Sequence, residues 1–326
     1  MMKKLVTFAA VGLGLLALAA AAACAIAFGG PGDPPPMASI NNPFKAVDFS
    51  DLPAPRRFAA RDGTPLAFHA YPPGTEPARG SVVLVHGSSA RGSSMHVMAR
   101  AFAAAGYAAY ALDMRGHGDS GTRGQIDYVG QLDDDLEDFM RAVKPPQPAT
   151  LVGFSAGGGF ALRFAGSERQ KLFANYLLLS PFISQDAATY RPGSGGWVSV
   201  GLPRIIAVAI LDAVGVQAFN QLPVTRFALS ESAKPFLTPQ YSFALAQNFR
   251  PRPDYLADIR AANQPMQVLA GTHDEAFHAD RFAAVFAQAG KTPPVTLLPG
   301  VGHIPLTLDL AAVQAAVAAV QRFETP

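Results

Sequence analysis

The chain has 326 residues, 49% of them hydrophobic and 15% charged, so it can bury one large core and still carry an inserted subdomain. A net charge of +2, with no cluster of basic residues, argues against a nucleic-acid partner. The single cysteine, Cys24, lies in an apolar N-terminal stretch, which excludes disulfides, structural zinc and thiol nucleophiles from the rest of the chain.

The N-terminus combines two lysines, Lys3 and Lys4, with an uncharged run over residues 5–28. About 20 apolar residues are enough for a helix to cross a bilayer, so we interpret residues 1–28 as a signal peptide or a membrane anchor. Lipidation at Cys24 is a third alternative. The lysines would keep the N-terminus cytoplasmic, which predicts an extracytoplasmic location in a bacterial cell envelope or periplasm, secreted or membrane-anchored, with membrane association through residues 5–28.

A Pro/Gly-rich linker at 29–43 precedes a hairpin signal around Asp62-Gly63. Strands and helices then alternate, which predicts a mostly parallel sheet covered by helices on both faces. Expected strands lie at 81–85, 107–112, 150–153, 174–179, 266–270 and 295–298, and expected helices at 94–105, 128–143, 277–289 and 306–323 and directly after 153.

Residues 184–255 break this alternation, with proline, glycine and aromatic residues mixed into short helical pieces. We interpret this region as a cap inserted into a core formed by 44–183 and 256–326. Its segment 201–214 is apolar nearly all round, which suits a helix that covers an apolar pocket, touches a membrane or packs on the core. The insertion carries more basic than acidic residues, which disfavours an aminopeptidase and leaves room for anionic head groups.

The most informative motif is Gly-Phe-Ser-Ala-Gly at 153–157, directly after the apolar run 149–152. A serine that attacks a carbonyl sits on a turn so tight that side chains two residues away on either side would collide, so glycines flank it. The run before the motif and the helical pattern after it match this strand, turn and helix arrangement. Ser155 is therefore the predicted nucleophile, and the alternative is a Gly/Ser loop without chemistry.

A serine hydroxyl needs a base, and His303 follows the last expected strand in a glycine-rich loop. An acid must orient that imidazole, and Asp274 follows the preceding strand. Glu275 and Asp280 are credible substitutes for Asp274. The sequence thus predicts a triad of Ser155, Asp274 and His303.

The oxyanion formed in such a reaction needs two backbone N–H donors. One is expected from Ala156, directly after the nucleophile, and the other from Ser88, after the strand that ends in His86-Gly87. His86 and His117 are expected to tie loop backbone together without taking part in catalysis.

Three motifs together resemble the α/β-hydrolase superfamily, and within it the monoglyceride lipase and lysophospholipase branch: His-Gly-Ser at 86–88, the run 113–120, and 153–157. The resemblance covers about residues 57–323. It implies an eight-stranded, mostly parallel sheet, a helical cap before the strand that carries the acid, and hydrolysis of a lipid carboxylic ester. The chain order of nucleophile, acid and base is that of this superfamily.

The leading hypothesis is a serine esterase or lipase that cleaves medium or long acyl esters, of acylglycerol or lysophospholipid type, through an acyl-enzyme. The alternatives are an acyltransferase, an amidase or peptidase using the same triad, and a non-catalytic envelope-associated module. Epoxide and haloalkane hydrolysis are disfavoured because they need aspartate where Ser155 stands. The expected partner is a small-molecule or lipid ester, with no metal and no cofactor.

Overall fold

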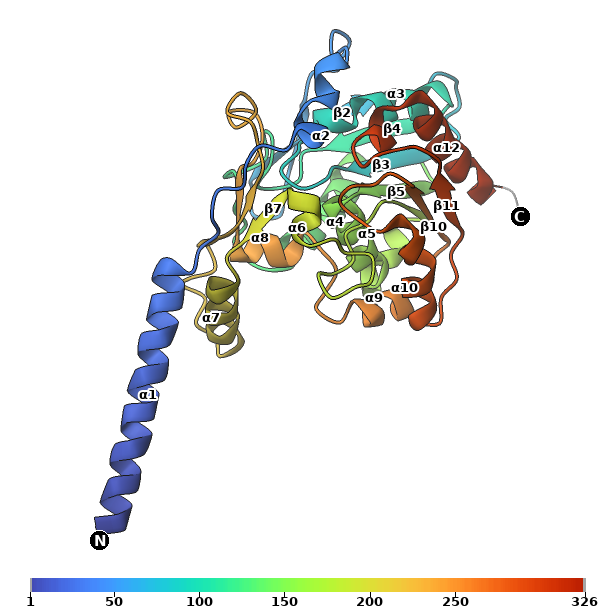
Figure 1. Ribbon diagram of the computed structural model, residues 1–326. Helices are drawn as coiled ribbons and strands as arrows, with labels where there is room; N and C mark the ends of the chain where they lie inside the picture. Colours follow the sequence, from blue (N-terminus) through green and yellow to red (C-terminus); the bar gives the residue numbers. More distant parts are fainter. Residues whose placement is uncertain (1, 325–326) are drawn as a thin grey trace.

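The computed structural model describes residues 2–324 and contains a central eight-stranded sheet in the order β1-β2-β4-β3-β5-β6-β10-β11 (Figure 1). Its strands are β1 Arg56–Ala59, β2 Pro65–Tyr71, β3 Ser81–Val85, β4 Ala108–Leu112, β5 Ala149–Phe154, β6 Asn175–Leu179, β10 Met266–Gly271 and β11 Val295–Leu298. The pairs β1/β2 and β2/β4 are antiparallel and the other pairs are parallel. The predicted α/β fold with a mostly parallel sheet is confirmed.

Helices cover both faces of this sheet (Figure 1). On one side α3 contacts α11 and α12, and on the other α5 contacts α9, which contacts α10. The helices around the core are α3 His96–Ala104, α4 Gln131–Val143, α5 Ala156–Ala165, α9 Tyr255–Ala261, α10 Phe282–Gln288, α11 Pro305–Leu308 and α12 Leu310–Gln321, with 3-10 turns at η2 Gly92–Met95, η3 Glu168–Leu172, η4 Ala279–Arg281 and η5 Arg322–Glu324.

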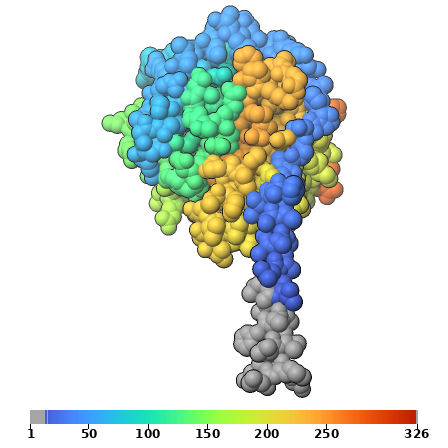
Figure 2. All heavy atoms as spheres, turned by 90° about the vertical axis from the view of Figure 1, so that its left-hand side faces the viewer, coloured from blue at the N-terminus to red at the C-terminus, as the bar shows by residue number. Residues whose placement is uncertain are grey.

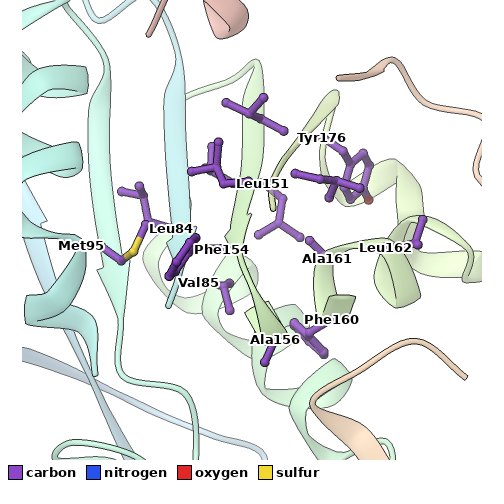
Figure 3. Packing of buried hydrophobic residues seen from close by; sticks show 14 of the residues in the cluster. Leu84, Val85, Met95, Leu151, Phe154, Ala156, Phe160, Ala161, Leu162 and Tyr176 are labelled. Carbon is purple, nitrogen blue, oxygen red and sulfur yellow. The ribbon is translucent and has the colours of Figure 1, made fainter. Parts of the chain in front are cut away.

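The central strands are apolar on both faces because helices bury both faces. Every residue of β3 and β5 is buried. In Figure 3, Leu84 and Phe154 of these strands lie beside Met95 of η2, whereas the α5 side chains Ala161 and Phe160 lie further to the right. This two-sided packing fixes the carboxyl ends of the strands, and the residues that follow those ends are therefore held rigidly.

The final helix, expected over 306–323, is two helices separated at Asp309. Asp309 has extended backbone angles (φ −66°, ψ 131°), and its carboxylate accepts hydrogen bonds from the N–H groups of Ala311 and Ala312. An aspartate in this position caps the start of a new helix, which explains the interruption.

The insertion between β6 and α9 contains α6 Gly193–Gly196, α7 Leu202–Ala213 and α8 Phe243–Asn248. It also contains a three-stranded antiparallel sheet of β7 Val198–Val200, β8 Pro223–Phe227 and β9 Gln240–Ser242, in addition to the short helices that were expected. Strands of three to five residues are too short for an alternating pattern to stand out in a sequence.

Helix α1 (Met2–Phe28) projects from the body beside the insertion, as Figures 1 and 2 show. Its C-terminal end lies against α7, where Arg204 donates hydrogen bonds to the carbonyl groups of Ile26 and Ala27. Within residues 2–324 no helix reaches the combined length and hydropathy needed to cross a membrane.

The predicted linker, 29–43, is attached to the insertion along part of its length. It contains α2 Ala38–Asn41 and continues into the 3-10 turn η1 Pro43–Ala46. The Met37 N–H and the Asn41 side-chain amide both donate to the carbonyl of Ala228, and Ile40 is buried. This segment is therefore part of the folded body.

Candidate active site

Ser155 stands on a strained turn between β5 and α5, with φ 55° and ψ −118°. The two flanking glycines are required by close contacts. A Cβ added to Gly153 would lie 2.2 Å from the Gly157 carbonyl oxygen, and a Cβ added to Gly157 would lie 2.3 Å from the His86 carbonyl oxygen. Positive φ is costly for a residue other than glycine and is maintained only where the surrounding structure enforces it. Side chains at positions 153 and 157 would thus collide with neighbouring backbone, as the sequence predicts.

The structure brings Ser155, His303 and Asp274 together at the carboxyl edge of the sheet. His303 Nε2 lies 3.0 Å from Ser155 Oγ, and His303 Nδ1 lies 2.8 Å from Asp274 Oδ2. All three side chains are buried. With Nδ1–H donating to the carboxylate, Nε2 is left as the acceptor of the serine hydroxyl proton.

Asp274 is held as an ionised acceptor at the end of β10. Its Oδ1 accepts hydrogen bonds from the backbone N–H groups of Ala276 and Phe277, at 2.8 and 2.9 Å. Burial alone would raise the pKa of Asp274, but the His303 imidazole and these hydrogen bonds outweigh burial and hold the pKa below its ordinary value of 3.8. The carboxylate is thus negatively charged at neutral pH and can stabilise an imidazolium.

The two substitute acids have other contacts. Glu275 Oε2 accepts the backbone N–H of His303 at 2.9 Å, so this side chain positions the loop that carries the imidazole. Asp280 forms an exposed ion pair with Arg281. Of these three neighbouring acids, Asp274 is the one whose carboxylate contacts the His303 ring.

The expected oxyanion donors lie on either side of the nucleophile. Ala156 is the first residue of α5, so its N–H has no acceptor within the helix. Ser88 follows β3 in the loop beside Ser155. In the described chain, 2–324, neither N–H donates to another protein atom, so both are free to bind a ligand oxygen.

His86 and His117 form a buried pair under this loop, with ring centroids 4.8 Å apart. His86 Nδ1 bonds the Gly87 carbonyl, and His117 Nε2 lies 2.6 Å from the Tyr241 hydroxyl of the insertion. Burial lowers the pKa of His86 to about 4 and that of His117 well below its ordinary value. Both rings are therefore neutral and tie backbone together, in line with the expectation from the sequence.

Two cavities meet at Ser155 and His303, one of 510 Å³ and one of 370 Å³. The larger is bounded by the N-terminal segment, the loop after β3 and residues 229–237 of the insertion, and the smaller mainly by other parts of the insertion. Trp197, the only tryptophan of the chain, lines both cavities and donates from Nε1 to Ser88 Oγ at 2.9 Å.

Sequence reasoning missed two parts of this site. No motif related Trp197, which lies in the insertion, to Ser88 or Ser155, and its being the single tryptophan was the available signal. Phe44 and Phe49 line the larger cavity, although the sequence predicted only that the core begins near residue 44. No local pattern relates them to Ser155, because only the path of the chain brings them near it.

No group of three or more His, Cys, Asp or Glu side chains within residues 2–324 is arranged to hold a metal ion.

Solved structures with this architecture are α/β hydrolases. A soluble variant of monoglyceride lipase from Saccharomyces cerevisiae, in complex with a substrate analogue, aligns with a TM-score of 0.64 and 18% identity over 83% of this chain and 94% of that one. A bacterial membrane phospholipase A aligns with a TM-score of 0.58 and 18% identity over 100% of this chain and 99% of that one. At these identities the likeness concerns the fold alone.

The chain belongs to the hydrolase family described as serine aminopeptidase, S33, whose profile matches residues 76–307. It is also 37% identical over 113 residues to a monoacylglycerol lipase of Mycolicibacterium smegmatis, a match that covers 33% of this chain and 39% of that protein. The resemblance seen in the motifs is thereby confirmed, and the family and this relative together support hydrolysis of carboxylic esters.

Proposed function

We propose that the protein hydrolyses carboxylic esters through an acyl-enzyme, with Ser155 as nucleophile, His303 as general base and acid, and Asp274 orienting the imidazole. The observation that carries the proposal is the 3.0 Å contact between His303 Nε2 and Ser155 Oγ, with Asp274 bonded to the other ring nitrogen. The strained φ of 55° at Ser155 supports it, because such strain is concentrated at functional sites.

In the acylation step Ser155 Oγ forms a bond to the acyl carbon while His303 Nε2 takes the hydroxyl proton. The carbonyl electrons move to the oxygen, and the N–H groups of Ser88 and Ala156 stabilise the oxyanion. One such donor is typically worth about 3 kcal/mol of transition-state stabilisation. His303 then protonates the leaving oxygen as the ester bond breaks, which releases the alcohol and leaves the acyl group on Ser155.

Deacylation repeats these roles with water as the nucleophile. His303 takes a proton from the water as its oxygen bonds to the acyl carbon. When the second tetrahedral intermediate collapses, the proton returns to Ser155 Oγ and the carboxylic acid is released. Asp274 stays ionised throughout and stabilises the imidazolium in both steps, in agreement with its lowered pKa.

The substrate we propose is an ester of a medium or long acyl chain, of the acylglycerol or lysophospholipid type. Two apolar-lined cavities meet at the nucleophile, so one can receive the acyl chain and the other the leaving group. The smaller cavity includes Leu202, Ile205 and Ala209 of α7, the helix that the sequence marked as apolar nearly all round. The partial match to a monoacylglycerol lipase supports the same class.

The test is labelling and turnover by the full chain and by Ser155→Ala. The full chain should react with a fluorophosphonate probe at Ser155 and hydrolyse p-nitrophenyl acyl esters with a burst of p-nitrophenol. Ser155→Ala should lose labelling and roughly 10⁴-fold or more of kcat. Full turnover by Ser155→Ala would refute the mechanism, and absence of labelling in the full chain would favour a non-catalytic module. Interception of the acyl group by an added alcohol or amine would favour a transferase, and faster cleavage of matched aminoacyl amides a peptidase.

We also propose that the protein lies outside the cytoplasm of a bacterial cell, secreted or anchored, with residues 1–28 as signal or anchor and association with membranes through residues 5–28. Helix α7 supports this proposal because Leu202, Ile206 and Ile210, four residues apart, expose an apolar stripe beside the end of α1. A large exposed apolar patch marks an interaction surface. Flotation of the full chain with lipid vesicles, compared with a chain that starts at Gly29, tests it: equal flotation of both chains would contradict a role of the N-terminal segment.

A further inference from the structure

Arg250 is a half-buried cation in the wall of the smaller cavity. Within the part of the chain that the structure describes, its guanidinium makes no ion pair and no hydrogen bond, and its Nε is fully shielded from solvent. Two arginines that are more fully buried are bound to acids: Arg115 to Asp135 at 2.7 Å and Arg163 to Asp133 at 3.0 Å. Shielding part of a charged group from water is costly unless something pairs with it, so the unbonded Nε of Arg250 needs an explanation.

The position of Arg250 connects it with the nucleophile. Its Cζ lies 5.5 Å from the centre of the Phe182 ring, and the Phe182 N–H donates to the Ser155 carbonyl at 2.9 Å. Arg250, Ser155 and His303 all line the same cavity of 370 Å³. The guanidinium therefore lies one side chain away from the turn that carries Ser155, in a space open to a substrate.

The surroundings of Arg250 leave its positive charge only partly balanced. Asp186 and Tyr190 of the insertion act on the guanidinium electrostatically, but Asp186 is exposed and, within residues 2–324, forms no ion pair with it. Burial lowers the pKa of Arg250 and Asp186 raises it in part. An anionic group that entered the cavity would find planar N–H donors without competing acceptors, which is the geometry that binds phosphate in two hydrogen bonds.

We propose that Arg250 binds the phosphate group of the substrate, so that this site hydrolyses lysophospholipids in preference to neutral monoacylglycerols. The proposal rests on the ester hydrolysis proposed above and names the substrate class of that site. In this arrangement the smaller cavity holds the glycerophosphate leaving group, and the larger cavity, with Phe44, Phe49 and Met95 in its wall, holds the acyl chain. The leaving group and the acyl chain would thus bind on opposite sides of Ser155.

The test compares two esters that share one acyl chain, 1-lauroyl-lysophosphatidylglycerol and 1-lauroylglycerol, at concentrations below micelle formation. The full chain should show a higher kcat/KM for the phosphate ester. In Arg250→Gln the ratio of the two kcat/KM values should fall about tenfold or more, mainly through KM, because the variant loses a charged hydrogen-bond donor. Arg250→Lys should recover part of the ratio because it keeps the charge.

A matched control is Arg260→Gln, which removes the same charge from a side chain that is 52% exposed and outside the cavity. It should leave the ratio unchanged. If Arg250→Gln lowers both esters equally, Arg250 is structural and the proposal is wrong. If it weakens inhibition by laurate and leaves the ratio unchanged, the guanidinium binds the carboxylate of the released fatty acid, which also overturns the proposal.

A second measurement does not depend on the folding of any variant. Glycerophosphoglycerol should inhibit hydrolysis of 1-lauroylglycerol by the full chain competitively and at least tenfold more strongly than glycerol does. Equal inhibition by the two compounds would refute a phosphate site. A failure of the underlying ester hydrolysis is a different result, because neither lauroyl ester would then be cleaved.

Discussion

The core and the insertion contribute to the site by different physical means. The core places the reacting atoms through backbone constraints: Ser155 on a strained turn, and His303 and Asp274 at the ends of buried strands. The insertion contributes side chains that form the walls of the cavities, among them Trp197 and Arg250. The comparison teaches that changes in the core should abolish turnover or folding, whereas changes in the insertion should alter which ester is preferred.

The largest effect is expected at the acid of the core. Asp274→Asn should lower kcat by about 10⁴-fold, because an amide donor facing His303 Nδ1 favours the wrong tautomer. Hydrolysis of p-nitrophenyl butyrate measures it, with Asp280→Asn as the control, since Asp280 pairs with Arg281 away from the ring. Activity of Asp274→Asn within tenfold of the full chain would mean that another group orients His303.

The next effect concerns the turn itself. Gly157→Ala should destabilise the fold by about 3 kcal/mol or more, because the new methyl group would overlap the His86 carbonyl oxygen, 2.3 Å from its ideal position. Chemical unfolding measures this loss. Gly32→Ala is the matched control, since the nearest atom to its added methyl group is the Ser199 hydroxyl at 3.9 Å. Equal stability of the two variants would show that the turn can relax.

The contact between core and insertion should make stability depend on pH. His86 has a folded pKa of about 4, and that of His117 is lowered well below 6.5, so the unfolded chain binds more protons between these values. Stability contributed by the neutral rings is present above pH 6.5 and is lost as the pH falls towards 4, by about 2 kcal/mol at pH 5 for His86, and His117 adds a loss in the same direction. Urea unfolding at pH 7 and pH 5 measures it.

The matched variant for this pH effect is His117→Gln, whose amide can still bond to the Tyr241 hydroxyl but does not titrate. Its stability should fall less between pH 7 and pH 5 than that of the unchanged chain. An equal slope in both proteins would assign the effect to other groups.

A smaller effect is expected for the tryptophan of the insertion. Trp197→Phe removes the hydrogen bond to Ser88 Oγ and part of the wall between the two cavities. We expect kcat/KM to fall about tenfold and the preference among p-nitrophenyl esters of four to twelve carbons to shift. A uniform loss over all chain lengths would mean that Trp197 acts on the oxyanion loop alone.

The smallest effect is expected on the outer face of α7. Ile210 is 62% exposed, so Ile210→Ser should change the free energy of unfolding by about 0.5 kcal/mol or less. Its binding to lipid vesicles should nevertheless weaken, whereas Ala207→Ser, on the buried side of the same helix, should affect stability more than vesicle binding. Unchanged vesicle binding by Ile210→Ser would remove α7 from the proposed membrane contact.

Local sequence determined much of the core. Alternating strand and helix patterns predicted the parallel sheet, because central strands buried on both faces must be continuously apolar. The glycines at 153 and 157 indicated the turn at Ser155, because steric exclusion acts within a few residues. Ser155, Asp274 and His303 could also be recognised from local sequence, because each follows the end of a strand that the apolar pattern predicts.

Tertiary structure alone decided which acid contacts the imidazole, how the N-terminal segment closes the larger cavity, and that Arg250 lies unpaired beside Phe182. Asp274, Glu275 and Asp280 all carry a carboxylate, and only the path of the loop after β10 decides which of them contacts the imidazole. Short-range sterics and periodicity depend on neighbouring residues, whereas contacts between segments that are distant in the sequence depend on how the whole chain packs.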